Sequence, residues 1–195
     1  MFDIADRLGP IARELLSAWS LLPAQDCVPN RADFDPMTIP RILPVISVLQ
    51  RRGDDAWCFR VAGTEVERRW ARHLTGLNYF DIDFVSPQAK HALRQEFRQI
   101  AEWPCGSWSR RRVAFASRRC AAIETLRLPL RNSDGRVGLI VSCSEEFPDT
   151  GTALVDAPRE IINITEREYL DIGARCPPRG ALAGGVHPEP TEFAA

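Results

Sequence analysis

The sequence lacks the motifs that identify the common enzyme classes. Its 195 residues include only three histidines and two tyrosines. No GxSxG, P-loop, HExxH or GxGxxG pattern occurs, so serine hydrolases, P-loop NTPases, zinc proteases and dinucleotide-binding oxidoreductases each miss their signature. We therefore expect a protein that is not an enzyme.

Charge of one sign and long apolar runs are also missing. The net charge is −1, so no overall field favours nucleic acid or an anionic membrane. No apolar run approaches the roughly 18 residues that span a bilayer. Asp3 and Asp6 stand where a signal peptide needs basic residues. We expect a cytoplasmic protein that contacts neither membrane nor nucleic acid.

The six cysteines form no CxxC pair. Without such spacing and without an export signal, a disulfide framework or a zinc site is not indicated. We expect reduced cysteines and no metal. The positions are Cys27, Cys58, Cys105, Cys120, Cys143 and Cys176.

Hydrophobic periodicity predicts one helix, two strands, two helices and three further strands, in that order. Strands grouped at both ends of the chain around central helices indicate an α+β fold with one antiparallel sheet. The predicted helices span 10–22, 65–74 and 87–103. The predicted strands span 43–51, 56–62, 107–117, 123–130 and 136–143.

The stretch 59–76 is the most informative part of the chain. Gly63 allows a tight turn out of a strand, and Thr64 with Glu67 predicts a capping box at the start of the next helix. Gly76 fits a left-handed helix stop. Helical spacing places four side chains on one face: Val66, Trp70, His73 and Leu74.

Several ordered motifs resemble a bacterial PAS-type domain family of single-domain proteins, first described as a domain of unknown function. The resemblance extends from about Leu15 to about Ser144 and includes the early Trp19. It rests on the order and spacing of the segments 31–36 (RADFDP), 39–44 (IPRILP), 59–64 (FRVAGT), 74–76 (LTG) and 126–130 (LRLPL).

The resemblance implies a PAS-like α+β fold: a five-stranded antiparallel sheet with helices on one face, preceded by an N-terminal amphipathic helix. We divide the chain into a helical extension (1–22), a PAS-like domain (23–147), an extension that docks on the core (148–174) and a disordered tail (175–195). PAS domains sense ligands or mediate protein contacts, often as dimers. No catalytic residues follow from the resemblance.

A pocket between the sheet and its helices would be mostly apolar, as small-molecule sites usually are. The residues expected to bind a ligand are Phe59, Val66, Trp70, His73, Tyr79, Phe97 and Phe115. His73 has no partner at metal-ligand spacing, so a structural or solvent-edge role is favoured over a haem ligand. The sequence leaves the ligand or cofactor unknown.

Two arginine clusters, 110–112 and 118–119, lie close to Trp108. Stacking plus phosphate contacts would suit single-stranded nucleic acid. Because a strand exposes alternate residues and the total charge is neutral, a solvated or partner-binding edge is the favoured interpretation.

Three functions are open at this point. The first is a non-enzymatic sensory or regulatory module that binds a small ligand or a protein and signals in trans to an unidentified partner. The second is an interaction module with a self-filled pocket, which dimerises through the apolar stripe of helix 10–22. The third is a small enzyme on a different α+β fold, which would need a buried Asp–His or similar pair.

Overall fold

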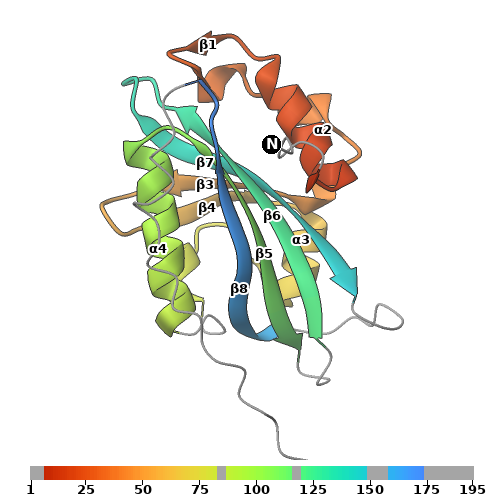
Figure 1. Ribbon diagram of the computed structural model, residues 1–195. Helices are drawn as coiled ribbons and strands as arrows, with labels where there is room; N and C mark the ends of the chain where they lie inside the picture. The colour runs from red at the N-terminus through yellow and green to blue at the C-terminus, as the bar shows by residue number, and fades with distance from the viewer. Residues whose placement is uncertain (1–6, 83–86, 116–119, 149–157, 174–195) are drawn as a thin grey trace, which may run out of the picture.

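The computed structural model describes residues 7–82, 87–115, 120–148 and 158–173 (Figure 1). Its helices are α2 (Pro10–Ser20), α3 (Thr64–Trp70) and α4 (Pro87–Glu102), joined by four 3₁₀ turns: η1 (Arg31–Asp33), η2 (Pro36–Thr38), η3 (Leu43–Val45) and η4 (Tyr79–Asp81). Its strands are β1 (Ala24–Gln25), β2 (Val28–Pro29), β3 (Ile46–Arg51), β4 (Trp57–Ala62), β5 (Gly106–Phe115), β6 (Cys120–Arg131), β7 (Val137–Pro148) and β8 (Pro158–Leu170).

One antiparallel sheet dominates the described residues, with the strand order β4-β3-β7-β6-β5-β8. The five predicted strands and the α+β class are confirmed. The strand count differs, because β8 pairs with β5 along its whole length, from Gly106 opposite Leu170 to Phe115 opposite Pro158. Residues 158–170 therefore extend the sheet to six strands and cover what would otherwise be the exposed edge of β5.

The sheet separates two hydrophobic clusters. On the inner face, α3, η4 and α4 pack against alternate strand residues such as Leu49, Phe59 and Ile123. On the outer face, α2 and the segment 34–42 pack against the other alternate residues, such as Val48 and Leu126. Figure 1 shows α4 and α2 well apart, on opposite sides of the strands. Both sheet faces are thus covered by the chain itself.

The N-terminal helix is shorter than predicted and its apolar stripe is not free. Ala12, Leu15 and Trp19 are buried against β6 and β7, and the Trp19 indole donates a hydrogen bond to the Pro129 carbonyl at 2.9 Å. The premise that this stripe awaits a second copy is therefore wrong. A dimer through helix 10–22 stays a prediction, and it would have to use the opposite side, where Leu21 is 83% exposed.

Helix α3 differs from its prediction at both ends. Gly63, not Thr64, occupies the N-cap, and no side chain caps the helix there. Ala71 adopts a left-handed conformation with φ 49° and ends the helix after Trp70, well before Gly76. Glu67 instead accepts a hydrogen bond from the Leu74 amide at 2.9 Å, which fixes the loop that follows the helix.

Candidate functional site

A cavity lies on the inner face, between the sheet and the helical elements α3 and η4. The space in it that a water-sized sphere can occupy is about 40 Å³, and the cavity is open to solvent. Its helical side is lined by Val66, Arg69, Trp70 and Tyr79. Its sheet side is lined by Ser47, Leu49, Phe59, Arg111, Val113, Ile123, Thr125, Arg127, Ser142 and Ser144.

Strand alternation explains why polar side chains meet here. Successive side chains of a strand point to opposite faces, so every second residue of β5, β6 and β7 faces the helices. In β5 these are Ser107, Ser109 and Arg111, and the strand-paired residues of β6 are Arg127, Thr125 and Ile123. The middle of the inner sheet face is therefore polar, and it is flanked by apolar residues such as Leu49 and Val113.

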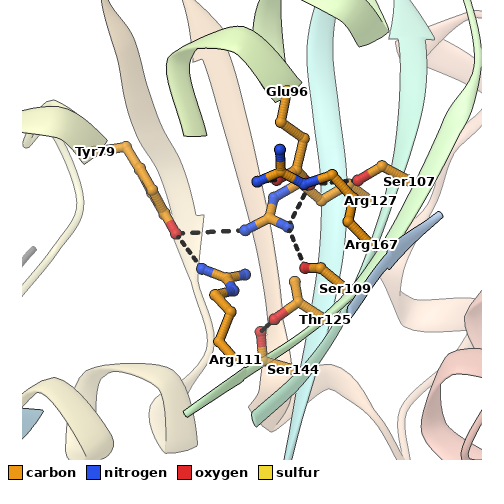
Figure 2. Close-up of polar contacts among 9 residues, drawn as sticks. All are labelled: Tyr79, Glu96, Ser107, Ser109, Arg111, Thr125, Arg127, Ser144 and Arg167. Atoms are coloured by element: carbon orange, nitrogen blue, oxygen red, sulfur yellow. Dashed lines mark hydrogen bonds and ion pairs between the residues drawn. The ribbon is translucent and has the colours of Figure 1, made fainter. Parts of the chain in front are cut away.

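A buried ion pair anchors the polar group (Figure 2). The Arg127 guanidinium lies 2.8 Å from a carboxylate oxygen of Glu96 on α4, and both side chains are essentially inaccessible to solvent. Arg167 of β8 approaches the other Glu96 oxygen at 3.2 Å, and the Ser107 hydroxyl donates to the same carboxylate. Burial alone would raise the pKa of Glu96, but Arg127, Arg167 and Arg111 outweigh it and lower that pKa to about 2.

Tyr79 joins two arginines on the cavity side of this pair. Its phenol oxygen accepts hydrogen bonds from Arg111 at 3.1 Å and from Arg127 at 3.4 Å. Burial opposes ionisation of the phenol, yet the two guanidinium charges lower the pKa of Tyr79 below its ordinary value. η4 places this ring, because Asn78 caps the turn by accepting a hydrogen bond from the Phe80 amide.

Arg111 is the unusual member of the group. It is 4% exposed, it lines the cavity, and no described carboxylate forms an ion pair with it. Tyr79 is its described hydrogen-bond partner, and its buried Nε has none. Burial, and then repulsion from Arg127, lower the pKa of Arg111. A guanidinium stays protonated despite such a shift, so the cavity wall carries a positive charge.

Arg69 of α3 supplies a further positive charge. Its side chain is 9% exposed and lies 3.6 Å from a carboxylate oxygen of Glu146 on β7. It also donates to the Ser144 carbonyl at 3.5 Å. Burial is the main cause of its lowered pKa. This pair ties the helical wall of the cavity to the end of β7.

The predicted ligand-binding residues fall into three groups. Phe59, Val66, Trp70 and Tyr79 line the cavity. Phe97 does not line it; the ring is fully buried behind Tyr79, with the ring centroids 5.2 Å apart. The remaining two predicted residues, His73 and Phe115, are not brought to the cavity by any described contact.

His73 lies beyond the end of α3 with its side chain 75% exposed, 2.8 Å from Glu67. Its placement in the pocket is therefore wrong, because the helix ends at Trp70 and the helical spacing that put His73 beside Trp70 does not continue. Phe115 closes β5, but its side chain lies outside the described residues.

The arginine run was the main signal missed in the sequence. The interpretation of 110–112 as a solvated edge is wrong for Arg111, which is buried, and β5 lies between two strands rather than at an edge. Trp108 is also buried, on the outer face, so its ring is not available for stacking on a base. Alternation from Val113 would have placed Arg111 and Ser109 on the inner face.

Among the described helices, none is long and apolar enough to cross a membrane.

A family model described as a PAS domain matches residues 9–143 of the chain. No curated protein matches the chain. The chain is similar to solved structures of VqmA, over about half of their length.

A ligand–DNA complex of Vibrio cholerae VqmA has 17% sequence identity and a TM-score of 0.43, and the match covers 60% of this chain and 52% of that one. VqmA bound to DPO has 16% identity and a TM-score of 0.42, with 57% of this chain and 56% of that one covered. A Vibrio cholerae VqmA dimer without target DNA has 17% identity and a TM-score of 0.42, with 60% of this chain and 52% of that one covered.

Proposed function

Since the chain belongs to the PAS domain family, we propose that it is a non-enzymatic sensory or regulatory module whose inner-face cavity takes a small ligand. The observation that carries the proposal is the cavity itself, which lies between the sheet and α3 with η4. Aromatic and aliphatic side chains form much of its wall, and a few polar groups converge within it. This combination is typical of small-molecule sites.

A ligand in this cavity would contact elements that connect to both faces of the sheet. Trp70 and Arg69 of α3 form one wall, and Arg69 pairs with Glu146 at the end of β7. The next residue, Glu145, points to the outer face, where a carboxylate oxygen lies close to Gly9 at the start of α2. We propose that ligand binding shifts α3 and β7 together and so alters the surface around α2, which would pass the signal to a partner in trans.

Native mass spectrometry of the freshly purified full chain, combined with an absorbance spectrum, tests the ligand. We expect an adduct mass of a small molecule that disappears under denaturing conditions. In Ser142→Phe, whose added ring would fill the cavity, the adduct should be lost while circular dichroism stays unchanged. Ser133→Phe, in an exposed turn, should keep it.

Val66→Phe from the opposite wall repeats the test if Ser142→Phe does not fold. An adduct that persists in every folded cavity-filling variant would place the ligand elsewhere. Its absence from the wild-type protein would contradict the proposal.

One observation favours the alternative of a self-filled pocket. Rings from three elements pack closely beneath α4, with Trp57 and Phe80 both 5.4 Å from Phe97 between centroids, and little of the cavity is wide enough for a water molecule. Under this alternative the chain acts only by protein contact. It predicts that cavity-filling variants behave as wild type in every binding assay.

A further inference from the structure

We infer that the ligand of this cavity is a small organic carboxylate with an apolar body, and that its carboxylate pairs with Arg111 beside the Tyr79 hydroxyl. The inference rests on the proposed ligand-binding function and adds the chemical class of the ligand. Four observations on the described residues carry it: the charge balance, the state of Arg111, the hydroxyl proton of Tyr79 and the apolar walls.

The charge balance of the site is positive. Three arginines line the cavity, Arg69, Arg111 and Arg127, and its lining includes no acidic residue. Behind the lining, Glu96 is shared between Arg127 and Arg167, and Glu146 faces Arg69. Four guanidinium groups thus meet two carboxylates, and Arg111 is the one without an ion-pair partner among the described residues.

Arg111 has no ion-pair partner among the described residues, although it is buried. Taking a charged group out of water costs much free energy unless an opposite charge accompanies it. Tyr79, a neutral phenol, compensates only one of its donors, and Nε is buried without an acceptor. A carboxylate matches the planar fork of a guanidinium with two parallel hydrogen bonds, which would restore the missing compensation.

Tyr79 gives an independent reason to expect an acceptor. A phenol has one hydrogen to donate, and arginines can only donate. Since Arg111 and Arg127 both donate to the Tyr79 oxygen, the phenol hydrogen must point to something else. No described group accepts it, whereas a carboxylate oxygen next to Arg111 would accept from both residues.

The rest of the wall limits what the carboxylate can be attached to. Leu49, Val66, Val113 and Ile123 are aliphatic, and Phe59 and Trp70 are aromatic. These side chains suit a hydrocarbon or aromatic body and give no hydrogen bonds to a polyanion such as phosphate. Hydroxyls of Thr125, Ser142 and Ser144 would accommodate at most a few polar substituents.

Thermal unfolding of the full chain with matched pairs of probes tests the inference. The carboxylates are benzoate, phenylacetate and isovalerate, and the controls are their primary amides, which have the same shape without the charge; inorganic phosphate is a third arm. We expect at least one carboxylate to raise the Tm, with amides and phosphate giving no shift. In Arg111→Met the affinity for that carboxylate should fall at least tenfold, and in Arg112→Met, on the exposed side of the same strand, it should stay within twofold.

The outcomes separate the class of ligand from ligand binding itself. Amides that stabilise as well as the acids, or an affinity unchanged in Arg111→Met, would leave a ligand-binding module but overturn the anionic class. Phosphate acting as well as the acids would overturn the apolar body. No shift with any carboxylate overturns the inference, and if the wild-type protein also carries no adduct in native mass spectrometry, the proposed function fails with it. Circular dichroism checks that Arg111→Met is folded, and Arg111→Lys, which keeps the charge but loses the fork, should bind with intermediate affinity.

Discussion

Arg111 lies inside the protein with a neutral phenol as its described hydrogen-bond partner. A residue of this kind lowers the stability of the empty protein, because its charge is desolvated without full compensation. Chains retain such groups where a ligand supplies the counter-charge, and perturbed buried groups in a cavity are candidates for function on that ground. Under the proposed function, stability and binding therefore oppose each other at Arg111.

Replacing Arg111 with Met should stabilise the ligand-free protein, by about 1 kcal/mol or more, since Met fills similar space without charge. Urea unfolding of the ligand-free chain measures this free energy directly. Arg112→Met, at an exposed position, should change it by less than about 0.5 kcal/mol. A large loss of stability in Arg111→Met would instead show that its bond to Tyr79 is structural.

Glu96 behaves in the opposite way, because its charge is fully paired. Glu96→Gln leaves Arg127 and Arg167 without their carboxylate and should lower the free energy of unfolding by about 3–5 kcal/mol. Burial opposes its charge, but the arginines lower its pKa in the folded state from an ordinary 4.5 to about 2.

Its stabilising effect is thus complete above the unfolded pKa and is lost as the pH falls from about 4.5 towards 2. Urea unfolding between pH 3 and 6 should show this slope in the wild type and a shallower one in Glu96→Gln. Glu102→Gln, at the exposed end of α4, serves as the matched control. Parallel pH curves for wild type and Glu96→Gln would contradict the assignment.

The sequence was informative about apolar site residues and poor for charged ones, for a physical reason. The apolar side chains of Phe59 and Val66 predict burial without any knowledge of how the strands pair. Arg111 and Arg127 can be assigned to a face of the sheet only by counting alternate residues from a buried apolar neighbour in the same strand. Without that step, a run of arginines indicates a solvent-exposed segment. Glu96 carried a usable signal: it lies three residues after Leu93 and one before Phe97, on the buried side of α4.

At the scale of elements, α2 works as the cover of the outer face. Its buried residues complete a cluster that includes Leu128 and Leu130 of β6, and its N-terminus is held by Glu124, which accepts from the Gly9 amide at 2.9 Å. A negative side chain at a helix N-terminus is favourable because it meets unpaired amides and the positive end of the helix dipole. The helix is thus fixed by packing along its length and by charge at its start.

Trp19→Ala should cost about 3–5 kcal/mol of unfolding free energy, since it removes a buried indole and its hydrogen bond to Pro129. Chemical denaturation measures the change. Ser17→Ala, at an exposed position of the same helix, should change it by less than about 0.5 kcal/mol. Equal, small effects of both substitutions would show that α2 does not cover the sheet in solution.

Considered as a whole, the molecule has a cavity on the inner face of its sheet and the helix α2 packed on the outer face. The order of strands and helices within 9–143 could be predicted, because hydrophobic period and turn residues are local signals. The sixth strand could not be placed, since pairing of residues 158–170 with β5 depends on contacts distant in sequence. The destination of the stripe on α2 was missed for the same reason: amphipathicity shows that a face is buried, but not against what.

The outer face, which α2 covers, bears on how the chain would dimerise. Deleting residues 1–22 would uncover the outer face and unfold the domain, so a point substitution is the sharper test of the predicted homodimer. Leu21, at the end of α2, is the most exposed large apolar side chain described and is a natural centre for such a contact.

We expect light scattering to give the wild type about twice its chain mass of 21.9 kDa, and Leu21→Asp the mass of one chain. The charge would be buried without a partner in the dimer, while the monomer would lose nothing. Trp103→Asp, at a 48% exposed position just after α4 on the other layer, should remain dimeric. A monomeric wild type, or a dimer that survives Leu21→Asp, would show that α2 only covers the sheet and that any output surface lies elsewhere.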